Sequence, residues 1–459
     1  MLLKHHIEVY KTKSPVSAKK SQTYFDRNFK AKTFPTGSYV IPMRQPKKRF
    51  LKTLFEADTK MEDAFLREVE ARRLRDSKLG LDTKKEGHGF YDVTSWALPV
   101  QYGVEASFTE DEISVSNMEK VTEVTKSGKV NGGKANYAYA FSQSQNAGTR
   151  LAAKLLQADF KVAITLLPTQ VNGINLDKGT YLVRVNRNPD TLHETIEKMA
   201  KEYGTEVQAL NTAWGDNGIT LGSKYVINLE KPRIMVMTQE PTQAVTFGCV
   251  YSVLTQRFGI EFTAVRTNMF NDVNLYDYNV ILFPDGNPAG YEKLLGKEGV
   301  EALSTWIKNG GTFIGLQGGA AFTTRKDVGL SDVELVTKQN NDTGNPIENI
   351  PGSMFKANVN NDYYLGLGMK SQIGVQFRGN YHFTPSKRGT NVISFAPDGH
   401  ISGHLWENTQ KDLAGKMYLA DIPHGDGHLI LFANDPTFRA YWRGLDNLFI
   451  GSIILPGGF

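Results

Sequence analysis

The chain has 459 residues, of which 40% are hydrophobic and 22% are charged. This composition is ordinary for a soluble globular protein, and the length suits roughly three domains. A net charge of +5 over this length gives no basis for a nucleic-acid partner. No run of 18 apolar residues occurs, so we expect no membrane span. Cys249 is the only cysteine, which excludes an intrachain disulfide and a cysteine-only zinc site.

Two segments of the chain share an order of short motifs. The first contains Leu2-Leu3, Ile7-Glu8-Val9, Gly37-Ser38-Tyr39 and Pro46, and the second contains Leu155-Leu156, Phe160-Lys161-Val162, Gly179-Thr180-Tyr181 and Pro189. Each order is typical of a helix end, a strand, a glycine turn, a second strand and a proline-initiated helix. We interpret them as two copies of one α/β unit, over residues 1–120 and 121–230. Two unrelated β-turn-β units are the alternative.

The second unit has a predicted strand at 136–141 and a predicted helix at about 147–156 ahead of its leucine pair. Only Met1 precedes the leucine pair of the first unit. A unit without its opening strand leaves a sheet edge unpaired, so we expect the first unit to be truncated. Between the two copies, residues 61–79 have helical spacing, 91–96 suit a strand or loop, and the polar stretch 106–129 is the best linker candidate.

Residues 231–459 alternate short apolar strands with amphipathic helices. Strands are predicted at 232–238, 261–266, 278–284, 312–316, 416–421 and 428–433, and helices at 242–258 and 291–308. This alternation favours a doubly wound, flavodoxin-like α/β sheet. Residues 325–390 are rich in Asn, Gly and Asp and are predicted to form a polar insertion, and 445–455 form a closing apolar segment.

A glycine-flanked corner, Gly315-Leu316-Gln317-Gly318-Gly319, follows the predicted strand at 312–316. The spacing matches the nucleophile elbow G-x-[SC]-x-G of α/β enzymes, but a glutamine amide cannot be ionised into a nucleophile. Asp285-Gly286 follow another strand, and ligands bind beyond the carboxyl ends of such strands. We therefore expect one crevice lined by Asp285, Gly286, Gln317, Gly318 and Gly319. It is either a ligand pocket or a vestigial corner whose glycines serve tight packing.

A second group of candidates lies among the histidines of the last third of the chain. His404 and Glu407 match H-x-x-E, and His400 precedes them after an expected turn at 397–399. Zinc requires three or four converging ligands, so we predict surface histidines and no metal site.

His424 and Asp426 have the residue types of a general base and its orienting carboxylate, and His428 follows them. A tight turn is the alternative, because glycines flank the aspartate. Asp435-Pro436 suits a capped helix start, and Arg439 with Trp442 suggests an exposed interaction surface as the alternative. No catalytic residue and no cofactor are predicted for this chain.

Three motifs together resemble one protein family. They are Gly37-Ser38-Tyr39-Val40-Ile41-Pro42 within 33–46, Tyr91-Asp92-Val93-Thr94-Ser95-Trp96 within 91–104, and Pro436-Thr437-Phe438-Arg439 within 436–444. They are similar to the C-terminal extension of bacterial zinc carboxypeptidase family proteins, which ends in a class I glutamine-amidotransferase-like domain. The resemblance implies that Gln317 stands in the position of the cysteine nucleophile. It also implies that zinc belongs only to a peptidase domain absent from this chain, and that the parent protein is periplasmic or extracellular.

These observations lead to an expected function. The chain is expected to be a non-catalytic portion of a zinc carboxypeptidase-like protein that scaffolds or presents substrate to the peptidase domain, its partner. Two alternatives stay open. One is a peptide- or glycan-binding module that uses 325–390 as a lid, and the other is a hydrolase that uses the crevice at Asp285 and Gln317.

Overall fold

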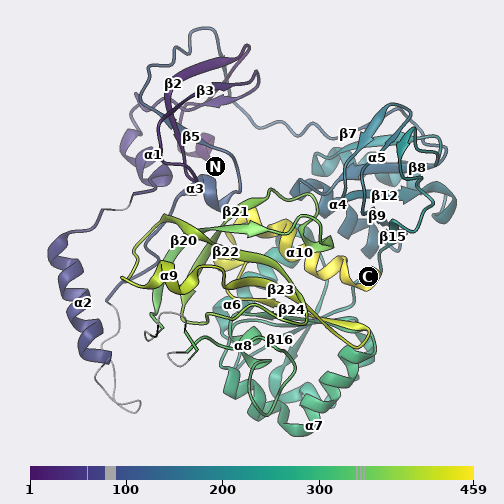
Figure 1. Ribbon diagram of the computed structural model, residues 1–459. Coiled ribbons are helices and arrows are strands. Elements are labelled where there is room, and N and C mark those ends of the chain that lie inside the picture. The colour runs from purple at the N-terminus through teal and green to yellow at the C-terminus, as the bar shows by residue number, and fades with distance from the viewer. Residues whose placement is uncertain (59, 78–88, 338–339, 342–343, 345–346) are drawn as a thin grey trace.

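The computed structural model describes residues 1–58, 60–77, 89–337, 340–341, 344 and 347–459. Figure 1 shows a mixed α/β protein with three parts: the first unit in purple, the second unit in blue and teal, and a large sheet with its helices between and below them. Within the described ranges, no helix has the length and apolar character needed to cross a membrane.

The large sheet lies in the C-terminal part of the chain. Among the described residues its strand order is β17-β16-β18-β19-β24-β23-β22-β20-β21. One half is parallel and contains β16 (Ile234–Thr238), β17 (Thr263–Arg266), β18 (Val280–Phe283), β19 (Thr312–Leu316) and β24 (Gly427–Phe432). The other half is antiparallel and contains β20 (Ile350–Val359), β21 (Gln372–Gly379), β22 (Thr390–Ser402) and β23 (Met417–His424).

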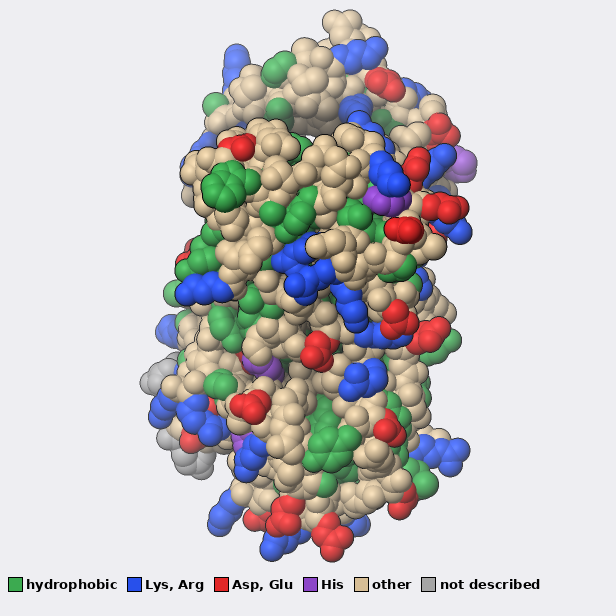
Figure 2. Space-filling view, turned by 90° about the vertical axis from the view of Figure 1, so that its right-hand side faces the viewer, with side chains coloured by type: hydrophobic (Ala, Val, Ile, Leu, Met, Phe, Trp, Pro, Cys, Tyr) green, Lys and Arg blue, Asp and Glu red, His purple; other side chains and the backbone are tan. Residues whose placement is uncertain are grey.

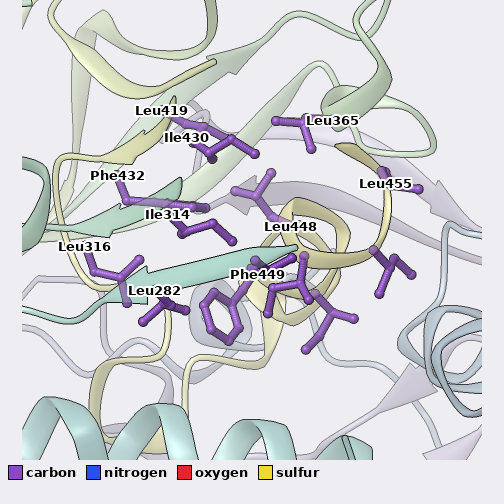
Figure 3. Close-up of a cluster of buried hydrophobic side chains, with 14 of the residues drawn as sticks. Leu282, Ile314, Leu316, Leu365, Leu419, Ile430, Phe432, Leu448, Phe449 and Leu455 are labelled. Atoms are coloured by element: carbon purple, nitrogen blue, oxygen red, sulfur yellow. The ribbon is translucent and has the colours of Figure 1, made fainter. Parts of the chain in front are cut away.

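Helices cover the parallel half of this sheet, as the doubly wound prediction requires. They are α6 (Ala244–Tyr251) with its π-helical continuation Ser252–Phe258, α7 (Pro288–Lys308), α8 (Gly318–Phe322) and α10 (Asp446–Ile454), and the short α9 (Thr409–Leu413) lies beside β22. The apolar segment predicted at 445–455 is α10. Figure 3 shows its Leu448 and Phe449 directed at Ile314 and Leu282 of the strands. Because both sheet faces are covered there, the four inner parallel strands β16, β18, β19 and β24 are almost entirely buried, whereas the edge strand β17 is mostly exposed.

Two predictions about the antiparallel half are wrong. Residues 325–390 are not merely a polar insertion, because they contribute β20 and β21 at one edge of the sheet. A strand with one solvated face carries polar residues, and those of β21 concealed the strand. The turn expected at 397–399 lies inside β22, where the pairing with β20 shifts in register between Phe355 and Ala357.

The second unit is built on two sheets. The larger has the order β15-β9-β12-β8-β13-β7, and the smaller has the order β11-β10-β14. The strands are β7 (Lys129–Asn131), β8 (Ala138–Ser142), β9 (Ala163–Thr165), β10 (Thr169–Val171), β11 (Ile174–Leu176), β12 (Thr180–Arg184), β13 (Glu206–Leu210), β14 (Asn217–Gly218) and β15 (Val226–Asn228). Helices α4 (Asn146–Gln157) and α5 (Leu192–Tyr203) belong to the same unit.

The first unit repeats part of this topology. Its sheets have the orders β6-β1-β4 and β3-β2-β5, which correspond to β15-β9-β12 and β11-β10-β14 when the strands are matched in chain order. The elements are β1 (Tyr10–Lys11), β2 (Val16–Thr23), β3 (Lys30–Phe34), β4 (Tyr39–Val40), β5 (Ser107–Thr109), β6 (Glu119–Lys120) and helices α1 (Lys48–Phe55) and α2 (Asp63–Ser77). The end of the helix predicted at 61–79 lies outside the described residues. The linker predicted at 106–129 instead supplies β5, β6 and the first residue of β7.

The glycine turns of the two units make equivalent backbone hydrogen bonds. Gly37 N–H donates to the carbonyl of Thr12 at 2.9 Å, and Gly179 N–H donates to the carbonyl of Thr165 at 2.7 Å. Both glycines have positive φ, 87° and 84°, which an L side chain rarely adopts. The β4–β1 register also matches the β12–β9 register, residue for residue. The shared topology and turn bonds support the predicted repeat.

The units are joined to the large sheet by direct contacts. The stretch 91–96, predicted as a strand or loop, forms a loop ahead of α3 (Leu98–Gln101). In this loop Thr94 N–H donates to the carbonyl of Gly352 at 2.9 Å, and Asp92 forms a two-armed ion pair with Arg439 at 2.7 Å. Helix α4 of the second unit packs against α10.

Candidate functional site

The corner after β19 has the backbone geometry of a nucleophile elbow. Gln317 has φ 50° and ψ −104°, and α8 starts at the next residue. A positive φ with this ψ is unfavourable for any residue with a Cβ atom and persists only where the surrounding structure enforces it. The strand-to-helix corner predicted from the glycine pattern is therefore present, with a glutamine at its strained position.

The structure brings the predicted crevice residues together. Gly318 N–H donates to Asp285 Oδ1 at 2.9 Å. A Cβ atom on Gly318 would lie 2.0 Å from the carbonyl oxygen of Gly286, and one on Gly319 would lie 2.1 Å from that of Phe283. Backbone thus packs directly on backbone between the ends of β18 and β19. These contacts explain the two glycines by close packing and close the space at both positions.

The Gln317 side chain contacts the antiparallel half of the sheet. Its Nε2 donates to the backbone carbonyl of Arg378 in β21 at 3.4 Å. Asn434 Nδ2, just beyond β24, donates to the same carbonyl at 2.8 Å. The amide at the nucleophile position thus makes a long hydrogen bond to a backbone oxygen, and it offers no group that could attack a carbonyl.

Two buried carboxyl groups lie at this edge of the sheet, Asp285 after β18 and Asp435 after β24. Each is only 7% exposed. Burial raises the pKa of Asp285 to about 6, against the lowering effects of the Gly318 and Gly286 N–H groups and the Arg378 cation. Burial also raises the pKa of Asp435 to about 7, although Thr437 donates to its carboxylate through N–H and hydroxyl at 2.8 and 2.6 Å. Burial cannot be read from a single position, so the sequence indicated only a helix cap at Asp435.

The remaining polar groups here are a cation, a phenol and a thiol. The pKa of Tyr381 is raised by burial and by the charge of Asp285. The positive charge of Arg378 acts to lower the pKa of both Asp285 and Asp92. Burial and the charge of Asp435 raise the pKa of Cys249 in α6 to about 11, so this cysteine is a protonated thiol rather than a reactive thiolate. The edge thus holds groups able to exchange protons, without an activated nucleophile among the side chains named here.

His404 and Glu407 have different surroundings. The His404 ring packs between Phe90 and Trp406, at centroid distances of 5.0 and 4.6 Å, and burial lowers its pKa. Glu407 is exposed and lies near the Arg73 cation. Among the side chains that the structure describes, no group of three or more His, Cys, Asp or Glu residues could hold a metal ion.

His424, Asp426 and His428 lie at the opposite edge of the sheet from the corner. They surround the hairpin between β23 and β24, and His424 Nε2 pairs with the Ser304 hydroxyl at 3.0 Å. His428 is level with Thr312, and Gln317 follows the other end of β19, roughly 16 Å away at 3.3 Å per residue. These residues are not positioned to serve a group at Gln317. The interaction surface suggested at Trp442 is also wrong, because that side chain is buried.

A polar network near the hairpin contains the candidate His428, but its other members had no signal in the sequence. Asp421 is fully buried and accepts hydrogen bonds from the hydroxyls of Tyr363, at 2.8 Å, and Tyr364. His428 Nδ1 lies 3.0 Å from its carboxylate. Burial lowers the pKa of His428, but the hydrogen bond and charge of Asp421 outweigh burial and raise the pKa overall. The partners are up to 58 residues apart, so only the folded chain assembles them.

Two hollows in the surface lie away from the corner. An open groove of about 650 Å³ runs along the amino ends of the parallel strands and is lined in part by Lys154, Lys231 and Arg233. A second, of about 390 Å³, lies in the second unit and is lined in part by Phe141 and Asp177. Neither lining includes Asp285 or Gln317. On the face shown in Figure 2, acidic and basic side chains are interspersed.

Comparisons with known proteins show likeness in part of the chain. No protein-family model matches it, and no curated protein matches it. Among solved structures, it is similar to a protein described as a GMP synthase component from Thermoplasma acidophilum (14% identity, 48% of this chain and 94% of that chain, TM-score 0.33). It is also similar to a glutamine amidotransferase from Thermotoga maritima (11% identity, 44% and 74%, TM-score 0.30). A third is a ThuA-like protein from Parabacteroides merdae (9% identity, 46% and 86%, TM-score 0.33).

Proposed function

We propose that this chain is a non-catalytic scaffold, the C-terminal portion of a zinc carboxypeptidase-like protein. The proposal rests on the residue at the nucleophile position of the elbow and on the packing of its glycines. Its nucleophile position holds Gln317, whose amide bonds to the carbonyl of Arg378, and its glycines pack against the backbone of Gly286 and Phe283. An elbow in this state stabilises the sheet and supplies no covalent catalysis.

The way in which the parts are joined supports a scaffolding role. The Asp92–Arg439 ion pair and the Thr94–Gly352 hydrogen bond fasten the loop at 91–96 to the large sheet. The second unit adds Asn146 Nδ2, which donates to the carbonyl of Arg443 at 3.1 Å. Contacts between segments roughly 260 to 350 residues apart resist separation of the three parts. The proposed partner is the peptidase domain of the parent protein, and the motifs that resemble the peptidase family's extension support this choice.

The proposal is tested by activity assays on the purified full chain. Carboxypeptidase turnover is measured with zinc supplied, and glutamine hydrolysis is measured in parallel. The scaffold predicts background rates in both assays. Zinc-dependent peptide cleavage by this chain, or ammonia release that a Gln317→Ala variant abolishes, would overturn the proposal.

A hydrolase is the second candidate, and the two buried carboxyl groups favour it. The raised pKa values of Asp285 and Asp435 place both near neutrality, where a carboxyl can serve as general acid or base. A water molecule activated by one of them would not require a side-chain nucleophile. Under this candidate, Asp285→Ala removes activity and leaves the melting temperature close to that of the parent chain. The scaffold predicts no activity in either chain.

A further inference from the structure

The pocket of about 390 Å³ in the second unit is lined by residues of both its sheets. The register of the larger sheet places several of them on one face. Ser142 of β8 is level with Thr180 of β12, and Ala140 of β8 is level with Gln208 of β13; residues paired across strands share a face. The methyl group of Ala140 is the smallest of these side chains, which leaves a hollow between them. Asn175 of the smaller sheet lines the same pocket.

The lining of this pocket is polar and carries no positive charge. Among the described residues that line it there is no lysine, arginine or histidine, whereas Asp177 and Glu206 supply carboxylates and Gln145, Asn175 and Gln208 supply amides. The carboxylates would repel an anionic ligand. An amide both donates and accepts hydrogen bonds, as the hydroxyl groups of a sugar do. The lining therefore suits a neutral ligand with many hydroxyl groups.

One buried hydroxyl in the wall of the pocket has no hydrogen-bond partner. Thr205 lines the pocket and is only 4% exposed, and its Oγ1 bonds to no group in the part of the chain that the structure describes. A buried polar group without a partner is unfavourable, and a ligand hydroxyl could satisfy it. The backbone that carries the Asp177 carboxylate is fixed, because its carbonyl accepts hydrogen bonds from the hydroxyls of Thr180, at 2.7 Å, and Thr165, at 3.2 Å.

A row of amides leads from the pocket across the smaller sheet. Gln170 of β10 is level with Asn175 of β11 on one side and with Asn217 of β14 on the other. The three side chains therefore share one face, and Gln170 Nε2 donates to Asn175 Oδ1 at 2.9 Å. The next pair along the strands, Thr169 and Leu176, is buried, so the amide row lies on the solvent side. At about 4.8 Å between strands, the row is roughly 10 Å long.

An exposed tryptophan lies near the far end of this amide row. Trp214 is 73% exposed and precedes Asn217 by three residues. The loop that carries it is fixed by Asp216, whose N–H donates to the carbonyl of Gln170 at 2.7 Å and whose carboxylate accepts a hydrogen bond from the N–H of Gly173 at 2.8 Å. An indole offers a large, rigid apolar surface, against which the apolar face of a sugar ring can pack.

We propose that the second unit binds a neutral oligosaccharide, with one sugar ring in the pocket and the following rings along the amide row toward Trp214. The pocket and the row together are longer than one sugar ring, which favours an oligosaccharide over a monosaccharide. The pocket supplies hydrogen bonds from fixed polar groups, and the tryptophan supplies apolar contact. This inference does not depend on the proposed function, because the lining of the pocket includes neither Asp285 nor Gln317.

The proposal is tested by isothermal titration calorimetry of the full chain with four neutral tetrasaccharides: cellotetraose, maltotetraose, mannotetraose and N-acetylchitotetraose. We expect at least one of them to bind saturably, with one site per chain. Gln208→Ala in the pocket and Trp214→Ala beyond the amide row should each weaken this binding at least tenfold. The matched control is Tyr276→Ala, at an exposed tyrosine outside the second unit, and it should bind like the parent chain.

Hydrogen exchange provides a readout in the parent chain alone. The bound tetrasaccharide should slow exchange of the amides at 204–208 and 215–218 and leave those at 312–316 unchanged. Absence of binding by all four sugars, equal loss in Trp214→Ala and Tyr276→Ala, or no protection in the second unit would overturn the proposal. Titration with spermidine tests the other ligand class, an organic cation. Saturable binding of spermidine that Glu206→Gln abolishes, with no binding of any tetrasaccharide, would assign the pocket to cations and would also overturn it.

Discussion

The backbone N–H of Gly318 donates a hydrogen bond to the buried carboxylate of Asp285 at 2.9 Å. This bond joins the end of β18 to the first residue of α8. It forms at the corner where α/β enzymes hold a nucleophile, but here the residue before Gly318 is a glutamine. The corner therefore has the backbone geometry of an active site, but its contacts are those of closely packed backbone segments.

Replacement of Gly318 by alanine should destabilise the protein strongly. The added Cβ atom would meet the carbonyl oxygen of Gly286 at 2.0 Å, and neither backbone can move without disturbing the sheet. We expect a loss of about 3 kcal/mol or more in the free energy of unfolding, measured by denaturant titration. Gly248→Ala is the matched control in helix α6, because a Cβ atom there meets nothing within 4 Å. A Gly318→Ala chain as stable as the control would show that the corner is loosely packed.

Substitutions at Gln317 test whether backbone strain or the side-chain hydrogen bond has the larger effect on the stability of the elbow. The positive φ costs on the order of 1–3 kcal/mol, whereas a neutral hydrogen bond contributes about 1 kcal/mol, and less at 3.4 Å. Gln317→Gly relieves the strain, and Gln317→Ala retains it, while both lose the bond. We expect the glycine variant to be more stable than the alanine variant by about 1 kcal/mol in chemical denaturation. The reverse order would mean that the backbone at this corner is not strained.

Asp435 should make stability depend on pH. Its pKa rises from an ordinary 3.8 to about 7 on folding, so the folded state binds the proton more tightly. Stability from this group is fully present below about pH 4 and is lost as the pH rises to about 7. Asp435→Asn should stabilise the chain at pH 8, by up to about 4 kcal/mol at 1.36 kcal/mol per pKa unit, and should have little effect at pH 4. Thermal melting at both values measures this, with the exposed Asp272→Asn as control; equal effects at both pH values would contradict the assignment.

His428 should have a pH effect in a higher range. Asp421 raises the pKa of His428 above 6.5, so its contribution to stability is full below pH 6.5 and is lost as the pH rises through the folded value. We expect His428→Gln to destabilise the chain more at pH 6 than at pH 9. His424→Gln provides a control of opposite sign, because burial lowers the pKa of His424. Melting temperatures measured from pH 6 to pH 9 test this prediction. A His428→Gln effect that does not depend on pH would contradict the ion pair with Asp421.

Most of the parallel half of the large sheet could be predicted from the sequence because the strands β16, β18, β19 and β24 are buried on both faces. Runs such as Val280–Phe283 are apolar at every position, and the glycine spacing around Gln317 indicated the corner. The repeat could also be predicted, since Gly37 and Gly179 are required by positive φ. These features depend on local chemistry, which a single sequence displays.

The rest depends on contacts between distant residues. β21 was missed because a strand with one solvated face lacks a continuous apolar run, and β20 was missed because proline, glycine and polar residues interrupt its apolar run although nearly all of it is buried. Asp435 was interpreted as a helix cap, and nothing near it in the sequence shows that it is buried beside Asp285. The Asp421–His428 network joins residues that only the folded sheet brings together. These strands and side chains are defined by burial and by contacts between distant residues, and the periodicity of the sequence predicts neither.

The central claim, that the corner is a structural joint without catalytic function, is tested most directly by comparing turnover of the parent chain and Asp285→Ala. Both are assayed on peptide, amide and ester substrates, with and without zinc, after melting curves confirm that both are folded. We predict equal rates at background for every substrate. A parent rate above background that falls at least tenfold in folded Asp285→Ala would contradict the account and establish the crevice as an active site.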